Sequence, residues 1–133
     1  ESALLKLSPY LPHMHAPLPA NTALPGGEFK QTDWPNLKGK VAQQAPFLST
    51  ETQQRLARSY GLRCFIILDE VNKLEDLGHH FGCGLYEREV EYLVNHEWAH
   101  NSEDILWRRT KLGYFFSTDE KTALEQYLSK GRF

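Results

Sequence analysis

The chain has 133 residues, which is the length of one compact domain. It is 41% hydrophobic and 24% charged, a composition that argues against a disordered or low-complexity chain. Fifteen Lys and Arg against 17 Asp and Glu leave a net charge of -2, so we expect no nucleic-acid partner. No apolar run approaches the roughly 20 residues of a membrane-spanning helix, so we expect no direct membrane span. The first residue is Glu1 and no signal peptide is visible, so we expect a processed chain or a piece of a longer one.

Proline separates an N-terminal arm from the rest of the chain. All seven prolines lie within the first 46 residues. Because proline lacks a backbone N–H and interrupts helices, we predict that residues 1–35 form an extended proline-rich arm, with one or two helical turns before Pro12. The sequence Leu24–Gly27 (LPGG) predicts a turn. We expect the arm to lie over a surface of its own domain or of a neighbouring one.

Residues 36–133 predict an all-α fold, a small bundle of five or six short helices. Ser49 and Thr50, with Gln53 three residues after Thr50, predict a helix over about 51–60 that ends at Gly61. The short apolar run 64–68 fits a buried strand or a helix, and we choose a helix because the sequence offers no partner strand. We expect a glycine-punctuated loop around His79–Phe81.

Three further helices are expected in the second half. The strongest covers about 86–97, with an inward stripe formed by Tyr86, Val90, Leu93, Val94 and Glu97. A second begins at Asn101 or Ser102, and its last turn is basic. A third opens with a capping box over Ser117–Glu120. We expect Glu87, Glu89 and Glu91 to form a solvated face rather than a pair of acid–base catalysts, and Trp98 and Trp107 to pack the junction between helices.

The sequence His96–His100 matches the H-E-x-x-H motif of zinc hydrolases. On one helix the two imidazoles would share a face and bind zinc, while Glu97 would activate a water molecule. No third ligand is evident, and Glu103 stands where the longer form of the motif has glycine. Two partly exposed histidines near a helix end are the favoured interpretation, and a small zinc hydrolase is the alternative.

Other candidates carry weaker signals. His79, His80 and the His13-x-His15 pair could ligate a metal, although loop histidines fit equally well. Cys64 and Cys83 are expected to be free thiols, and one intramolecular bridge stays open. No G-x-G-x-x-G, G-x-x-x-x-G-K-[ST] or G-x-S-x-G motif is present, so no nucleotide or flavin site is predicted within these residues.

Three cations, Arg108, Arg109 and Lys111, stand at the end of the helix that begins near residue 101. They could bind a phosphate or the carboxylates of a partner. Basic residues in a last helical turn also complement the helix dipole, which explains them without a ligand. Both interpretations stay open.

The stretch Tyr86–Gly113 (YEREVEYLVNHEWAHNSEDILWRRTKLG) strongly resembles the C-terminal domain of FAD-dependent glycerol-3-phosphate dehydrogenases and α-glycerophosphate oxidases. Supporting matches are Leu24–Gly27, Arg58–Gly61 and Leu74–Gly78, so the resemblance runs over about 24–128. In that family the segment is a helical cap that follows an FAD- and substrate-binding part. The family pattern usually has Arg at the position of His100, which argues against zinc.

The resemblance implies a function for a longer protein. It oxidises sn-glycerol 3-phosphate to dihydroxyacetone phosphate and passes electrons through FAD to a quinone. It implies that residues 1–35 link to the FAD domain and that 36–133 form the cap. The cap carries no catalytic residue and has the N-terminal FAD and substrate domain as its partner. The full enzyme would be cytoplasmic and peripherally membrane-associated. Rigidity, gating, docking and homo-oligomer formation all stay open as roles of the cap, and a pure interaction module is a further alternative.

Overall fold

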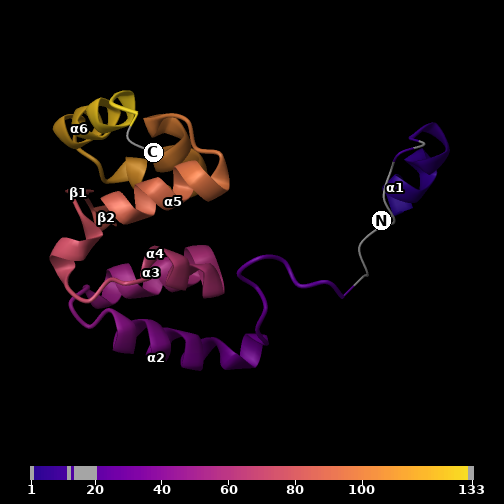
Figure 1. The fold of residues 1–133 in the computed structure, drawn as a ribbon, viewed down its shortest axis with the longest axis horizontal. Helices are drawn as coiled ribbons and strands as arrows, with labels where there is room; N and C mark the ends of the chain where they lie inside the picture. The colour runs from indigo at the N-terminus through magenta and orange to yellow at the C-terminus, as the bar shows by residue number, and fades with distance from the viewer. Residues whose placement is uncertain (1, 12, 14–20, 132–133) are drawn as a thin grey trace.

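The computed structural model describes residues 2–11, 13 and 21–131 (Figure 1). Over these residues the chain is mostly helical, which confirms the predicted fold class. The α-helices are α1 Ser2–Leu7, α2 Trp34–Gln44, α3 Thr50–Tyr60, α4 Cys64–Ile67, α5 Glu87–Glu97 and α6 Thr118–Ser129. In Figure 1, α2, α3 and α4 form one half of the body, α5 and α6 form the other, and α1 stands apart from both.

The start of α6 follows the capping box predicted from the sequence, whereas α3 is capped by Ser49 and not by the predicted Thr50–Gln53 pair. The hydroxyl of Ser49 accepts a hydrogen bond from the backbone N–H of Thr52, and α3 ends at Gly61. At α6, Ser117 and Glu120 form the predicted capping box, in which each side chain accepts from the other residue's backbone N–H. These contacts satisfy N–H groups that would otherwise lack a partner at a helix start.

The expected loop around His79–Phe81 is instead a small antiparallel hairpin. Strand β1, His80–Gly82, pairs with β2, Leu85–Tyr86, and a bulge interrupts the register. Phe81 and Leu85 are buried, and this anchoring holds two strands that are too short to be stable alone. The run Cys64–Ile67 is helical, as predicted.

The segment after α5 departs from a regular helix. Asn101 caps it as predicted, because its side-chain oxygen accepts from the N–H of Asp104, but Asp104–Arg109 is π-helical. Trp107 is half-buried, whereas Trp98 is 80% exposed, so the prediction that both pack the junction is wrong for Trp98. Trp98 ends α5 in a left-handed conformation (φ 55°), and the fully buried Ala99 enters the core in its place.

The predicted helical turns near the N-terminus are present as α1. Further along the chain, Gly26 packs closely against Gly61. The carbonyl of Gly26 accepts from the N–H of Leu62 at 2.9 Å. Gly61 has φ 55°, and a Cβ there would overlap the Gly26 carbonyl oxygen, so glycine is required. Pro12, His15 and the prolines at 17 and 19 lie outside the described residues. The division into an arm (1–35) and a cap (36–133) stays a prediction, and α2 begins at Trp34.

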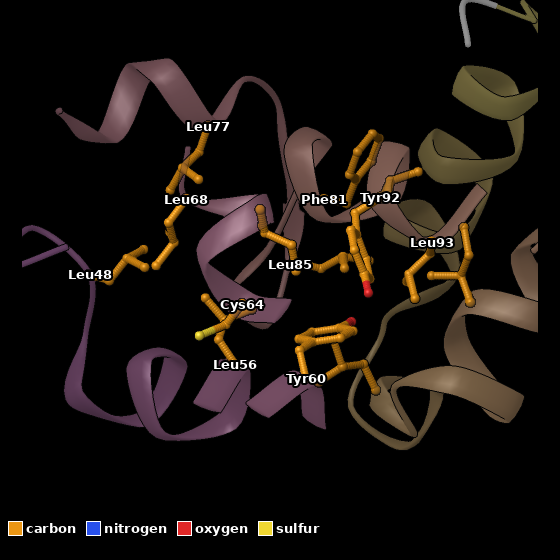
Figure 2. Close-up of a cluster of buried hydrophobic side chains, with 14 of the residues drawn as sticks. Leu48, Leu56, Tyr60, Cys64, Leu68, Leu77, Phe81, Leu85, Tyr92 and Leu93 are labelled. Carbon is orange, nitrogen blue, oxygen red and sulfur yellow. The ribbon is translucent and has the colours of Figure 1, made fainter. Parts of the chain in front are cut away.

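One continuous hydrophobic core joins the two halves of the body (Figure 2). Leu56 of α3, Cys64 of α4, Leu85 of β2 and Leu93 of α5 all belong to it, each 3% exposed or less. Burying such side chains stabilises the fold by about 1.5–3 kcal/mol each. Among the described residues, no helix is both long and apolar enough to cross a membrane.

Candidate functional site

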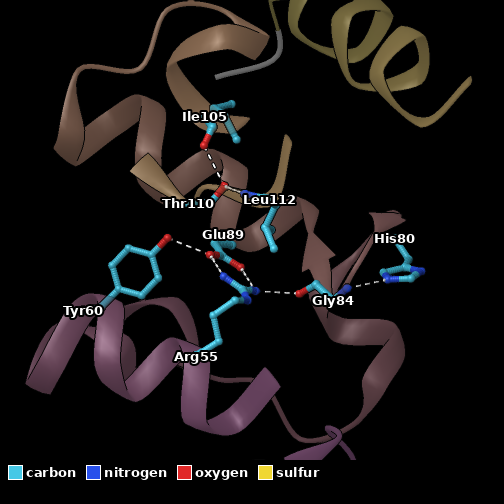
Figure 3. A network of polar contacts seen from close by, with 8 residues as sticks. All are labelled: Arg55, Tyr60, His80, Gly84, Glu89, Ile105, Thr110 and Leu112. Atoms are coloured by element: carbon cyan, nitrogen blue, oxygen red, sulfur yellow. Dashed lines mark hydrogen bonds and ion pairs between the residues drawn. The ribbon is translucent and has the colours of Figure 1, made fainter. Parts of the chain in front are cut away.

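A buried ion pair ties α3 to α5 (Figure 3). The Arg55 guanidinium donates to both carboxylate oxygens of Glu89, at 2.6 and 2.7 Å, and also to the carbonyl oxygen of Gly84 at 2.8 Å. The Tyr60 hydroxyl donates to the same carboxylate at 2.6 Å. The Glu89 side chain is 3% exposed, so the prediction that it lies on a solvated face is wrong. The reason is that Arg55 and Tyr60 replace the water that a lone carboxylate needs.

The network shifts the protonation of its members. Burial raises the pKa of the Tyr60 hydroxyl, and the adjacent Glu89 carboxylate raises it further. Burial by itself lowers the pKa of Arg55, but the charge of Glu89 and its hydrogen bonds outweigh that effect and raise it overall. Tyr60 therefore stays neutral and Arg55 stays charged. The network thus has a structural role and does not transfer protons.

A groove of about 560 Å³ opens beside this network, between the start of α3, the hairpin and the turn after Lys111. Its lining combines apolar, hydroxyl and charged groups: Ser49, Glu51, Thr52, Arg55, His80, Cys83, Gly84, Leu112 and Phe115. In the hairpin the imidazole of His80 accepts from the N–H of Gly84 at 3.2 Å.

The two cysteines are free, as expected, but they differ in environment. Cys83 is exposed on the hairpin turn, with φ 49°. Partial burial, followed by the charge of Glu120, raises the pKa of its thiol. Cys64 lies in the core, where burial raises the pKa of its thiol to about 12. Neither thiol is activated as a nucleophile, since activation requires a lowered pKa.

The predicted basic cluster lies on an exposed segment together with aromatic side chains. Arg108 forms an ion pair with Asp104, and Lys111 donates to the backbone carbonyl of Trp107. Arg109 is exposed. Its guanidinium forms no hydrogen bond or ion pair among the described residues. Hydrogen bonds from the N–H of His100 and then from Arg108 hold the pKa of Asp104 below its ordinary value. The cluster is therefore only partly neutralised within the domain.

Two aromatic side chains follow the cluster directly. Tyr114 and Phe115 are each 75% exposed, although their neighbours Leu112 and Phe116 are buried. The ring of Tyr114 makes a T-shaped contact with Trp107, and Phe115 lines the groove beside Arg55. Exposed aromatic groups next to arginine are typical of protein-binding surfaces.

The H-E-x-x-H motif does not lie on one helix. α5 ends at Glu97, and Trp98 turns the chain before His100 is reached. His96 stacks against Tyr92, with ring centroids 5.0 Å apart, and the side chain of Glu97 accepts from the Tyr92 hydroxyl at 3.3 Å. The shared helical face that would hold zinc is therefore not formed.

The remaining histidines are divided between separate contacts. His79 packs on Phe81, and His80 packs on Tyr86. His13 is exposed, and its partner His15 is outside the described residues. Within the described part of the chain, no three His, Cys, Asp or Glu side chains are grouped so that they could hold a metal ion.

Comparison with known proteins assigns the family. Residues 19–129 match the family model described as the C-terminal domain of alpha-glycerophosphate oxidase. The chain belongs to this family. It is 47% identical over 96% of its length to a glycerol-3-phosphate dehydrogenase of Pseudomonas aeruginosa, and 35% identical over 96% to the aerobic glycerol-3-phosphate dehydrogenase of Escherichia coli.

A third relative widens the range of activities within the family. A D-erythritol 1-phosphate dehydrogenase of Brucella abortus is 32% identical over 96% of the chain. In each of these three comparisons the match covers only 25% of the relative's own length. This domain is therefore shared by dehydrogenases named for different polyol phosphates.

Proposed function

We propose that the chain is the C-terminal accessory domain of a FAD-dependent glycerol-3-phosphate dehydrogenase. The longer protein removes two electrons and two protons from the C2 carbinol of sn-glycerol 3-phosphate, yields dihydroxyacetone phosphate and passes the electrons to a quinone. The observation that carries the proposal is the 47% identity to a glycerol-3-phosphate dehydrogenase over 96% of this chain.

The described residues do not fit FAD. A dinucleotide site needs a parallel strand, a glycine-rich turn and a helix whose N-terminus faces the pyrophosphate. The sheet of this domain is one short antiparallel hairpin, and Gly82 and Gly84 are packed against Glu120 and Thr52. FAD and substrate are therefore assigned to the part of the longer protein outside these 133 residues, and this domain plays a structural role.

The proposed partner of this domain is the FAD- and substrate-binding part of the longer protein. The domain packs against its own FAD- and substrate-binding part, with Arg109 and Lys111 available for carboxylates and Arg108 already paired with Asp104. The longer protein is proposed to associate peripherally with a membrane, where its quinone acceptor resides.

The test uses the longer protein that contains this chain. We expect it to purify with bound flavin and to reduce a quinone analogue when sn-glycerol 3-phosphate is added. The 133-residue chain alone serves as the control and should show neither flavin absorbance nor turnover.

D-erythritol 1-phosphate should be assayed in parallel, because one relative is named for that substrate. Turnover of D-erythritol 1-phosphate alone would refute the proposed substrate. Flavin binding by the 133-residue chain would refute the structural role.

A further inference from the structure

We propose that Arg109, Lys111, Tyr114 and Phe115 form the surface through which this domain docks onto the preceding, catalytic part of the same polypeptide. The expected occupant is an apolar segment of that part, inserted beside Phe115 and flanked by carboxylates that pair with Arg109 and Lys111. We refer to these four residues as the docking surface. The inference rests on the proposed function, because it requires a longer oxidoreductase.

The exposure of the two aromatic side chains is the first argument. Tyr114 and Phe115 are 75% exposed, yet they stand between Leu112 and Phe116, each 6% exposed. The buried Leu112 and Phe116 therefore hold the backbone of this turn in place. On that fixed backbone, Tyr114 and Phe115 expose two large aromatic side chains to solvent. Such preorganised aromatic groups lose little conformational entropy on binding and often dominate the affinity of an interface.

The groove next to Phe115 supplies a receptor for a partner's side chain. It measures about 560 Å³, and its floor includes the buried Leu112 and the glycine backbone of the hairpin turn. Arg55 is held rigidly at this groove by its bonds to Glu89 and Gly84. An inserted apolar side chain would thus meet a surface that needs little rearrangement.

Charge indicates which occupant fits. Residues 61–133 carry nine basic and thirteen acidic side chains, so this half of the domain is acidic overall. An anionic membrane would be repelled by most of that surface and attracted only locally. A protein surface can place single carboxylates opposite Arg109 and Lys111 without meeting the rest of the charge.

The lengths of the relatives leave room for such an occupant. The chain matches a C-terminal domain and spans a quarter of the length of the glycerol-3-phosphate dehydrogenases it resembles. Three quarters of such a protein are therefore available to cover a surface that the domain's own core leaves open.

The experiment compares hydrogen–deuterium exchange in the longer protein and in the 133-residue chain. We expect segments 80–84 and 110–116 to exchange at least tenfold more slowly in the longer protein. Phe115→Asp should abolish most of that protection, and Tyr114→Asp should reduce it. Leu74→Ser, at a residue that is 40% exposed and outside the docking surface, is the matched control and should leave the protection unchanged.

Phe115→Asp in the 133-residue chain checks that the variant folds. Because Phe115 is exposed, its unfolding transition should coincide with that of the parent chain. A longer protein that oxidises sn-glycerol 3-phosphate but shows equal exchange in the two segments overturns the docking surface alone. A longer protein that shows the protection without oxidising the substrate overturns the proposed function and leaves the docking contact in place.

Two further outcomes would assign the surface to another partner. Binding of the 133-residue chain to vesicles of phosphatidylcholine with phosphatidylglycerol, lost in Phe115→Asp, would identify a membrane surface and overturn the proposal. Dimerisation of the chain in analytical ultracentrifugation, lost in the same variant, would identify a second copy and would also overturn it.

Discussion

Replacing Glu89 with leucine tests whether the buried ion pair holds α3 and α5 together. The substitution leaves the Arg55 guanidinium, whose side chain is 18% exposed, without its carboxylate, and it removes the acceptor of the Tyr60 hydroxyl. Removing one partner of a buried ion pair costs about 3–5 kcal/mol. Small domains have a total stability of about 5–15 kcal/mol, so Glu89→Leu should unfold a substantial fraction of the chain at modest denaturant.

The assay is equilibrium unfolding in urea, followed by circular dichroism and by tryptophan fluorescence. The double variant Arg55→Met, Glu89→Leu should recover most of the loss, because neither charge is then buried alone. Adding Tyr60→Phe should recover the remaining 1–3 kcal/mol or so that an orphaned hydroxyl costs. Glu91→Leu on the same helix, outside the network, is the control. A loss below about 1 kcal/mol for Glu89→Leu, or a double variant no better than the sum of the single ones, would refute the reasoning.

Three further predictions concern the turn, the cap and the thiols. Gly61→Ala should lower the free energy of unfolding by more than the ~1 kcal/mol typical of a point substitution, because the new Cβ would overlap the Gly26 carbonyl oxygen at a positive φ; an unchanged urea midpoint would contradict this. Hydrogen bonds from Ser117 hold the pKa of Glu120 below its ordinary 4.5, so the cap's stabilisation is present above that pH and is lost as pH falls through the lowered pKa. Ser117→Ala should therefore destabilise the chain by about 1 kcal/mol at neutral pH and by less in acid, as thermal melts at several pH values would show. A thiol reagent should modify Cys83 in the native chain, faster as pH rises, and Cys64 only in denaturant; mass spectrometry that finds both modified in the native chain would disprove the burial of Cys64.

The sequence predicted those features that depend on local chemistry. The Ser117–Glu120 capping box and the glycine end of α3 were predictable because neighbouring residues supply both partners. The hairpin was missed because strands of two and three residues are held by the burial of Phe81 and Leu85, which is a tertiary effect. The end of α5 near residue 97 was predicted, but the left-handed turn at Trp98, which exposes this side chain and buries Ala99 instead, was not marked by the sequence pattern.

Glu89 was missed even though a signal for its burial was available. It stands four residues before the buried Leu93, on the same face of α5. A charged residue within an apolar stripe requires a buried counter-charge, and Arg55 occupies the matching position in α3. The identity of that counter-charge, 34 residues away, could only come from the three-dimensional arrangement.

The order in which the helices pack has a kinetic consequence. α2 lies against α3, α3 against α4 and α4 against α5, so neighbours in the chain are mostly neighbours in space. Helical domains with such local contacts reach the native state within microseconds to milliseconds. The tie between Arg55 and Glu89 spans 34 residues and needs both halves in place. We therefore expect this ion pair to form after the folding transition state. It should then slow unfolding without speeding folding.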